Sequence, residues 1–304
     1  MDLTYRLLNV FTDGQDPFTG NGVAVFEDAS GLTTRQMQTL ASQVNTETVF
    51  ILPKGADETA AVRFFSPEKE TGFAGSASLA TAAVLRELRG GEGDVQLVEE
   101  IDPTSDAESA NHPGGRDSAD APRPYTVVQK DDLWILDVHE PEAAPLKASP
   151  QILSSLVGLS TDALGGDVMT VGNGNGGGIV LPVRTVADVR KTRLDARMLH
   201  SYAMLLNTEP RVYVWADSDK EEDTIVSRMF YGPRGGVLEV AATGTGGANL
   251  GAWLAAHGMR GIHRRVIQGR INGRRSLLDL RIDDEGEVYV GGRVAEVARG
   301  TFTL

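Results

Sequence analysis

One carboxylate in this sequence has a position that favours proton chemistry. Glu47 lies between a predicted helix that ends near Val44 and an apolar strand at residues 49–52. Burial at such a junction favours the protonated form of a carboxyl group. A group that binds and releases a proton near neutral pH suits general acid or base catalysis. We therefore predict that Glu47 is catalytic; the alternative is a surface glutamate, or one that pairs with the next strand.

Two predicted helices begin with glycine followed by a hydroxyl side chain. The first begins at Gly75 and Ser76, and the second begins at Gly244, Thr245 and Gly246, about one domain length later. The first turn of a helix has unpaired N–H groups and a partial positive charge, so it attracts anions. We expect these five residues to bind one small anionic substrate. The alternative is two buried helices whose small residues permit close packing.

The elements that must position these residues are mainly strands. Apolar runs bounded by glycine and proline predict strands in both halves of the chain, and Thr33 is the expected N-cap of a further helix. Each half therefore has several strands and one glycine-initiated helix near its middle. This order predicts a two-domain α+β protein with a cleft between the halves. The predicted strands are 5–11, 23–26, 49–52, 61–65, 95–99, 127–128, 133–138, 179–181, 212–215, 227–230, 266–271, 277–282, 288–290 and 294–304.

The composition is that of a globular protein, because 41% of the 304 residues are hydrophobic. The absence of cysteine excludes disulfides, thiolate metal sites and cysteine nucleophiles. The five histidines lack the spacing of metal ligands, so no metal is expected. The sequence has no signal-peptide pattern and no apolar run long enough to span a bilayer, which predicts a cytoplasmic protein without a membrane partner.

The net charge of −13 is concentrated in two segments. Most of the acidic excess lies in residues 92–123 and 217–223, which we expect to be surface loops. Residues 102–124 are also rich in Ser, Gly and Pro and poor in apolar residues, so we predict a mobile loop or a linker there. No basic stripe is present, and a nucleic-acid partner is therefore not expected.

Several short motifs occur in an order that resembles one known family. The order is similar to that of the phenazine-biosynthesis isomerases, the PhzF-like proteins, which have the diaminopimelate epimerase fold. The resemblance covers nearly the whole chain except the acidic insert near 102–124 and the loop at 217–223. The motifs are GNGVAVF at 20–26, NTETVF at 45–50, FFSP at 64–67, FAG at 73–75, AATGTG at 241–246 and QGR at 268–270.

The resemblance implies two similar domains, each a barrel-like curved sheet around a central helix. We place the first domain at residues 1–124, completed by strands near 293–304, and the second at residues 125–292. The active site would lie in the cleft between the two helix N-termini. There a Glu in the position of Glu47 would move a proton between carbons of a cyclic dienyl carboxylic acid. No cofactor is implied, and similar proteins are commonly homodimers.

The sequence departs from the family pattern at two functional positions. Ser76 stands where the family isomerases typically have His, and Val240 stands where they have Asp. A serine hydroxyl can donate a hydrogen bond but cannot act as a base near neutral pH, and a valine side chain can neither donate a hydrogen bond nor act as a base. The adjacent Glu239 should point to the opposite face of its strand. We therefore expect a more apolar pocket, with Val240 and the mildly altered Thr245 contacting the substrate, and a poor standard isomerisation.

These features predict a cofactor-independent PhzF-like enzyme of specialised metabolism. Glu47 would act as general acid or base on a small cyclic or unsaturated substrate with a carboxylate or an enolisable carbonyl. The reaction would be an isomerisation, or a dehydration or cyclisation that needs one acid–base group. The alternative is a non-catalytic PhzF-like protein that binds a metabolite. An amino-acid epimerase is disfavoured, because the paired cysteines of such enzymes are absent.

Overall fold

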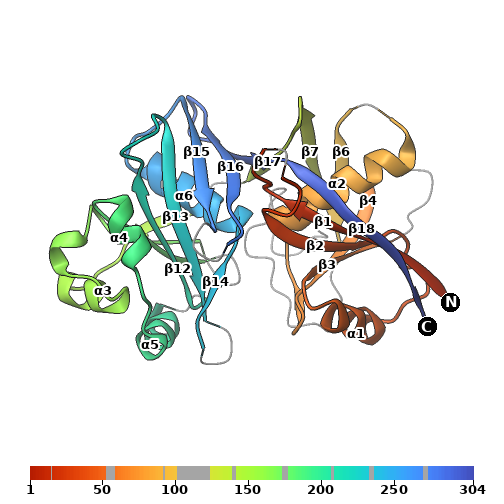
Figure 1. The fold of residues 1–304 in the computed structure, drawn as a ribbon, viewed down its shortest axis with the longest axis horizontal. Coiled ribbons are helices and arrows are strands. Elements are labelled where there is room, and N and C mark those ends of the chain that lie inside the picture. The colour runs from red at the N-terminus through yellow and green to blue at the C-terminus, as the bar shows by residue number, and fades with distance from the viewer. Residues whose placement is uncertain are drawn as a thin grey trace. The chain divides into compact units, whose positions relative to one another are not determined.

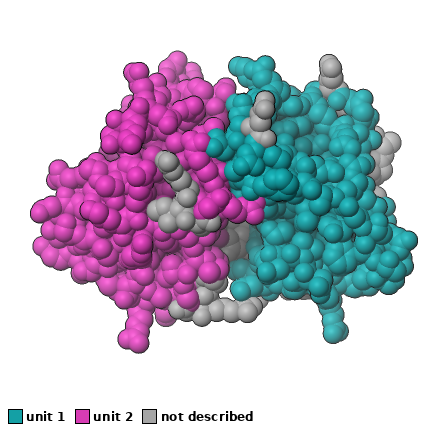
Figure 2. All heavy atoms as spheres, in the orientation of Figure 1, with its two compact units in different colours: residues 1–139, 291–304 teal, residues 140–290 magenta. Residues whose placement is uncertain are grey.

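Contacts within the chain gather its residues into two units, shown in Figures 1 and 2. The first unit contains residues 1–139 and 291–304, and the second contains residues 140–290. The computed structural model describes residues 1–14, 16–52, 59–91, 93–100, 124–138, 142–172, 177–206, 209–232, 236–269 and 273–304. The predicted loop or linker at 102–124 therefore lies outside the described residues, apart from residue 124.

The first unit is a sheet of mixed pairing with two helices. The strand order is β18–β1–β2–β3–β4–β6–β7–β8, in which β2 with β3 and β4 with β6 are parallel and the other pairs are antiparallel. The short strand β5 pairs with the end of β4. The elements are β1 (Asp2–Val10), β2 (Asn21–Phe26), α1 (Thr34–Val44), β3 (Glu47–Leu52), β4 (Ala60–Phe65), β5 (Glu70–Thr71), α2 (Gly75–Arg89), β6 (Val95–Glu99), β7 (Tyr125–Lys130), β8 (Leu133–Val138) and β18 (Val294–Thr303).

Consecutive buried residues in β2 and β3 require cover on both faces of this sheet. The helix α2 supplies one cover: it contacts β1, β2, β3, β6, β7 and β8, and nearly all of its first eleven residues are buried. The helix α1 supplies the other, with Met37 and Leu40 packed against Phe26 and Phe50. Its start is fixed by the predicted N-cap Thr33, whose side chain forms a capping box with the third helical residue.

The second unit has the same kinds of elements with a larger number of short helices. Its helices include the predicted glycine-initiated helix, now α6. The elements are β9 (Ala143–Pro145), α3 (Pro150–Leu156), the 3₁₀ helix η1 (Thr161–Ala163), β10 (Met169–Val171), β11 (Gly178–Pro182), α4 (Val186–Lys191), α5 (Ala196–Leu206), β12 (Arg211–Asp217), β13 (Thr224–Tyr231), β14 (Leu238–Val240), α6 (Gly244–Ala256), β15 (Ile262–Gln268), β16 (Ser276–Ile282) and β17 (Val288–Gly292).

The strand pairing of the second unit repeats that of the first. The order β10–β11–β12–β13–β15–β16 alternates antiparallel and parallel pairs as β1–β2–β3–β4–β6–β7 does. The short strand β14 pairs with the end of β13, as β5 pairs with the end of β4. In both units the glycine-initiated helix follows that short strand. The repeated sequence phrase therefore marks a repeated topology.

One ion pair occurs at the same place in both repeats. Arg63 on β4 donates from Nε and Nη2 to the two carboxylate oxygens of Glu70 on β5, at 2.7 and 2.8 Å. Arg228 on β13 makes the same two bonds to Glu239 on β14, at 3.1 and 2.6 Å. Such a fork fixes the direction of both partners. It holds each short strand that leads into the following helix.

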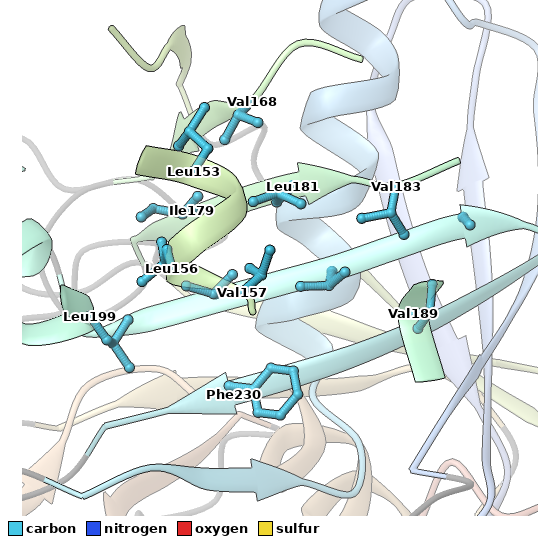
Figure 3. Packing of buried hydrophobic residues seen from close by; sticks show 13 residues of the cluster. Leu153, Leu156, Val157, Val168, Ile179, Leu181, Val183, Val189, Leu199 and Phe230 are labelled. Carbon is cyan, nitrogen blue, oxygen red and sulfur yellow. The ribbon is translucent and has the colours of Figure 1, made fainter. Parts of the chain in front are cut away.

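The face of the second sheet that α3 and α4 cover carries a large apolar cluster, seen in Figure 3. Leu153 and Leu156 of α3 and Val189 of α4 pack against residues of β11, β12 and β13, such as Ile179 and Phe230. The helix α6 contacts β9, β10, β11 and β16. The sheet of this unit is thus covered by several short helices and by α6, in agreement with the runs of buried residues in β11, β12 and β13.

The division of the chain lies later than the boundary placed after residue 124. The strand β7 pairs with β6, and β8 pairs with β7, so residues 125–138 belong to the first unit. At the other end, β18 pairs with β1 along its length and completes the first unit. The second boundary falls within β17.

A buried arginine links β1, α2, β18 and the residue that follows β2 in the first unit. The guanidinium of Arg6 on β1 contacts Glu27 at 2.5 Å, Glu87 on α2 at 2.6 Å and Glu296 on β18 at 3.0 Å. Arg299 on β18 binds the same Glu87 and Glu296, at 2.8 and 2.9 Å. Hydrogen bonds from Arg299, followed by those from Arg6, hold the pKa of Glu87 and of Glu296 below the usual range.

This network predicts an acid-sensitive component of stability. A carboxyl group whose pKa is lowered by folding stabilises the protein when the pH is above the group's pKa in the unfolded chain, which is about 4.3. This contribution is lost as the pH falls through the group's pKa in the folded protein. We expect Arg299→Gln to reduce the drop in melting temperature between pH 7 and pH 3, a range that extends below the unfolded pKa of the two carboxyl groups. The control is Arg265→Gln, which removes the exposed pair with Glu221. An acid-induced drop as large in Arg299→Gln as in the wild type would contradict this account.

Candidate active site

Glu47 is the first residue of β3, where the chain leaves α1 for the sheet. Asn45 ends α1 in the left-handed conformation, with φ of 58°. The hydroxyl of Thr46 donates to the carbonyl oxygen of Gly22 at 2.8 Å, and Glu47 is paired in parallel with Val23 of β2. This local structure fixes the backbone of Glu47 at the end of a buried strand and leaves its side chain partly buried.

Two donors converge on one oxygen of the Glu47 carboxylate. The hydroxyl of Ser76 donates to Oε2 at 2.6 Å, and Nδ2 of Asn21 donates to the same oxygen at 3.4 Å. Ser76 lies in the first turn of α2 and is buried, and Asn21 is the first residue of β2. Donors to a carboxylate fix its orientation and favour its charged form. The arrangement can hold a base in a defined direction.

Asn21 is a contact that our residue-level reasoning missed. It lies in the motif GNGVAVF, which contributed only to the family resemblance. Its place at the start of a strand that is parallel to β3 brings it beside Glu47. The sequence separation of the two residues gives no local signal of this contact, because it depends on strand pairing.

The start of α6 is the second predicted anion site. Gly244 and Gly246 are buried and Thr245 is partly buried. Thr243 is the N-cap, and its side chain accepts from the N–H of Gly246 at 3.3 Å. A Cβ on Gly246 would lie 2.6 Å from the ring of Tyr213, so close packing also requires glycine at this position. The packing alternative raised by the sequence is therefore realised here.

Val240 ends the short strand β14 that precedes α6. Its side chain is partly buried, and its carbonyl oxygen accepts from Nε2 of Gln268 at 3.1 Å. The neighbouring Glu239 is bound by both nitrogens of Arg228, as described above. Glu239 therefore does not replace the acid absent at Val240, in agreement with the strand alternation.

The predicted site residues thus form two groups, one in each unit. Glu47 and Ser76 are in contact in the first unit, and Gly75 precedes Ser76 at the start of α2. The residues Val240, Gly244, Thr245 and Gly246 lie along one strand-to-helix connection in the second unit. Of the QGR motif, Gln268 and Gly269 border this connection, and Arg270 lies outside the described residues.

The described part of the chain contains no group of three His, Asp or Glu side chains that could hold a metal ion. Among the same residues, no helix is long and apolar enough to cross a membrane.

Comparisons with known proteins agree with the fold and with an isomerase-like enzyme. The PhzC-PhzF family model, described as phenazine biosynthesis-like protein, matches residues 8–300. The chain is 28% identical over 311 residues to an uncharacterized isomerase of Pasteurella multocida, covering 97% of this chain and 92% of the relative. It is also 28% identical over 310 residues to trans-2,3-dihydro-3-hydroxyanthranilate isomerase of Pseudomonas chlororaphis, covering 99% of each.

A solved structure extends the likeness to the fold. A predicted epimerase of Pseudomonas aeruginosa superposes with a TM-score of 0.74 at 26% identity, covering 99% of both chains. The expected epimerase-like α+β fold is thereby confirmed.

Proposed function

Because the chain belongs to the PhzC-PhzF family of phenazine biosynthesis-like proteins, we propose that this isomerase-like enzyme moves a proton between carbons of a small unsaturated carboxylic acid. The observation that carries the proposal is the 2.6 Å hydrogen bond between Ser76 and Glu47 at the start of α2. It provides an oriented carboxylate beside the N–H groups of a helix N-terminus.

In the proposed reaction Glu47 acts first as a base and then as an acid. Its carboxylate takes a proton from a carbon next to the conjugated system, and the electrons of the broken C–H bond delocalise toward the substrate carboxylate. The double bond shifts, and Glu47 returns the proton to another carbon of the same conjugated system. Ser76 and Asn21 keep Oε2 in place through both steps. No proton is gained or lost overall.

The helix starts are proposed to bind the charge of the substrate. N–H groups at Gly75 and Ser76, and at Gly244 and Thr245, offer donors for a carboxylate or a developing oxyanion, whereas the N–H of Gly246 already donates to the Thr243 side chain. Val240 is proposed to contact an apolar part of the substrate. With a single acid–base group, a dehydration or cyclisation that begins with the same proton abstraction also suits this set of residues.

The test is turnover of a small panel of cyclic dienyl carboxylic acids, followed by proton NMR. The panel contains trans-2,3-dihydro-3-hydroxyanthranilate, the substrate named for the relative from Pseudomonas chlororaphis, and an analogue without the amino group. We expect a product with a shifted double bond, and a higher kcat/KM for the analogue, because Val240 offers no partner for an ammonium group. Absence of any product from folded protein would contradict the proposal.

The loss of the Ser76 hydroxyl should slow this reaction. A hydrogen bond to a charged group contributes about 1.5–3 kcal/mol, so we expect Ser76→Ala to lower kcat about 10–100-fold. The control is Ser154→Ala, which removes a buried serine hydroxyl that bonds a main-chain carbonyl in the second unit. Steady-state kinetics of the two variants provide the comparison. Equal effects of both changes would show that Ser76 has no special role.

A second candidate is a metabolite-binding protein without catalysis. The observation that favours it is the pair of departures at Ser76 and Val240, neither of which is a base. Isothermal titration with the same panel separates the two functions. Saturable binding without any product supports the binding protein, whereas turnover excludes it.

The specialised pathway and the homodimer remain proposals that rest on the family resemblance, and the cytoplasmic location remains a proposal as well. Light scattering of the purified chain tests the last of these. A mass near twice 32.5 kDa is expected, and a monomer at all concentrations would contradict it.

A further inference from the structure

The first turn of α2 lacks the side-chain cap that fixes the first turn of α6. Thr243 caps α6, whereas the N-cap of α2 is Ala74, whose side chain accepts no hydrogen bond. Ser76 nevertheless has to be held firmly, because its hydroxyl orients the Glu47 carboxylate. Another group must therefore stabilise the start of α2.

A buried tyrosine provides a hydrogen-bonded chain to this turn. The hydroxyl of Ser78 donates to the carbonyl oxygen of Ala74 at 2.9 Å, and it lies 2.9 Å from the hydroxyl of Tyr125. A serine hydroxyl has one hydrogen, so Tyr125 is the donor in the second bond. The direction is then Tyr125 to Ser78 to Ala74, which ends on the N-cap residue of α2.

Tyr125 also contacts the residue that precedes the N-cap. Its ring lies edge-on to that of Phe73, with centroids 5.3 Å apart and planes at 87°. Burial, together with the nearby charge of Glu99, raises the pKa of Tyr125, so its hydroxyl stays protonated and remains a donor at neutral pH. Tyr125 thus holds the turn from Phe73 to Ser78 on both sides of Ser76.

We propose that Tyr125 is a positioning residue for the Glu47–Ser76 pair, acting through Ser78 and the main chain at Ala74. Tyr125 is the first residue of β7, a strand far from α2 in sequence but paired with β6 in the same sheet. It brings the rigidity of the sheet to the first turn of α2. Its effect on the reaction comes from the direction of the Ser76 hydroxyl.

The second unit contains a matched tyrosine. Tyr213 on β12 is also buried, and its hydroxyl donates to Ser227 at 2.8 Å, which lies 3.5 Å from the carbonyl oxygen of Ile267. This chain ends on a strand rather than on a helix N-cap. The variant Tyr213→Phe therefore removes an equally buried hydroxyl without touching α2.

The first experiment needs no substrate. The amide of Ser78 donates to the carbonyl oxygen of Ala74 at 2.9 Å, so its hydrogen exchange reports opening of this turn. We expect Tyr125→Phe to speed exchange at Ser78 about tenfold and Tyr213→Phe to change it less than twofold. Exchange at Ser78 that is unaltered in Tyr125→Phe would overturn the proposal. Ser78→Ala, which removes both hydroxyl bonds, should show a larger effect at the neighbouring amides and serves if Tyr125→Phe does not fold.

The second experiment separates positioning from general stability, and it rests on the proposed function. We expect Tyr125→Phe to lower kcat about fivefold to tenfold and to leave KM within twofold. In a Ser76→Ala background the same change should have no further effect on kcat, because Tyr125 acts through Ser76. An equal loss in both backgrounds would overturn the positioning role. If the wild type turns over no substrate, the proposed function fails, while hydrogen exchange still decides the role of Tyr125 in holding the turn.

Discussion

Glu47→Gln is expected to lower the rate of proton transfer about 10²–10⁴-fold, which is the usual contribution of a general acid or base. Glutamine has nearly the same shape and keeps an oxygen that can accept from Ser76, so the fold and substrate binding should be retained. The amide cannot take a proton from carbon. The measurement is kcat and KM on the substrate that the wild type turns over, and the loss should appear in kcat.

Two further variants make this result specific. Glu47→Asp keeps the charge but shortens the side chain by one methylene, which should move the carboxylate away from the Ser76 hydroxyl and give an intermediate rate. Glu285→Gln neutralises an exposed carboxylate on the loop between β16 and β17 and should leave kcat unchanged. A Glu47→Gln variant that changes only KM would place Glu47 in binding rather than in catalysis.

Gly269→Ala is expected to destabilise the second unit by about 4 kcal/mol or to prevent its folding. Gly269 has φ of +72°. This backbone conformation is energetically unfavourable for any residue that has a Cβ atom. A Cβ would also lie 2.2 Å from the carbonyl oxygen of Arg274 and 2.4 Å from that of Ala241. Both obstacles are main-chain atoms, so a rotamer change cannot relieve them. Urea unfolding at equilibrium measures the loss.

Gly273→Ala separates the conformational cost from the steric one. Gly273 also has a positive φ, +83°, but a Cβ there would meet no atom within 4 Å. We expect this variant to lose only about 1 kcal/mol. Similar losses for both variants would mean that the close approach of Gly269 to Ala241 is relieved in solution. Because Ala241 follows Val240, that outcome would also mean that the connection leading into α6 can move to accommodate a larger side chain.

The sequence predicts elements well where local signals are strong. Thr33 was expected as an N-cap, and it closes a capping box with Gln36. The strand β15 begins at Ile262, four residues before the predicted start at residue 266. The prediction missed its first half because exposed His263 and Arg265 alternate there with partly buried residues, so no apolar run marks the strand. The sequence does not predict the three-residue strand β14. None of its residues is fully buried, and it is a strand only through its pairing with β13, so no apolar run marks it.

The division of the chain was harder to infer than its elements. The acidic stretch that starts near residue 102 has the composition of a linker, so residues 125–138 were assigned to the second domain. Strand pairing places them in the first unit instead: Tyr125 is opposite Leu97 of β6. The composition of a segment indicates whether it is solvated. The unit to which a strand belongs depends instead on its pairing partners, which can be distant in the sequence.

The site shows the same distinction between local and distant information. The helix starts at Gly75 and Gly244 are visible in the sequence as glycine–hydroxyl pairs. Ser76 and Glu47 are 29 residues apart in the sequence, and only the packing of α2 against the sheet brings them into contact. The bonds of Asn21 and Tyr125 also depend on strand pairing, so periodicity and propensity carry no signal for them.

The central claim is that Glu47 transfers a proton between substrate carbons, and solvent exchange tests it most directly. The wild type and Glu47→Gln are incubated in D₂O with the proposed substrate, and deuterium is located on carbon by NMR. In the wild type, deuterium is expected at the carbon that receives the proton, and in Glu47→Gln its incorporation should be slowed at least about 100-fold. Equal incorporation by both proteins would contradict it.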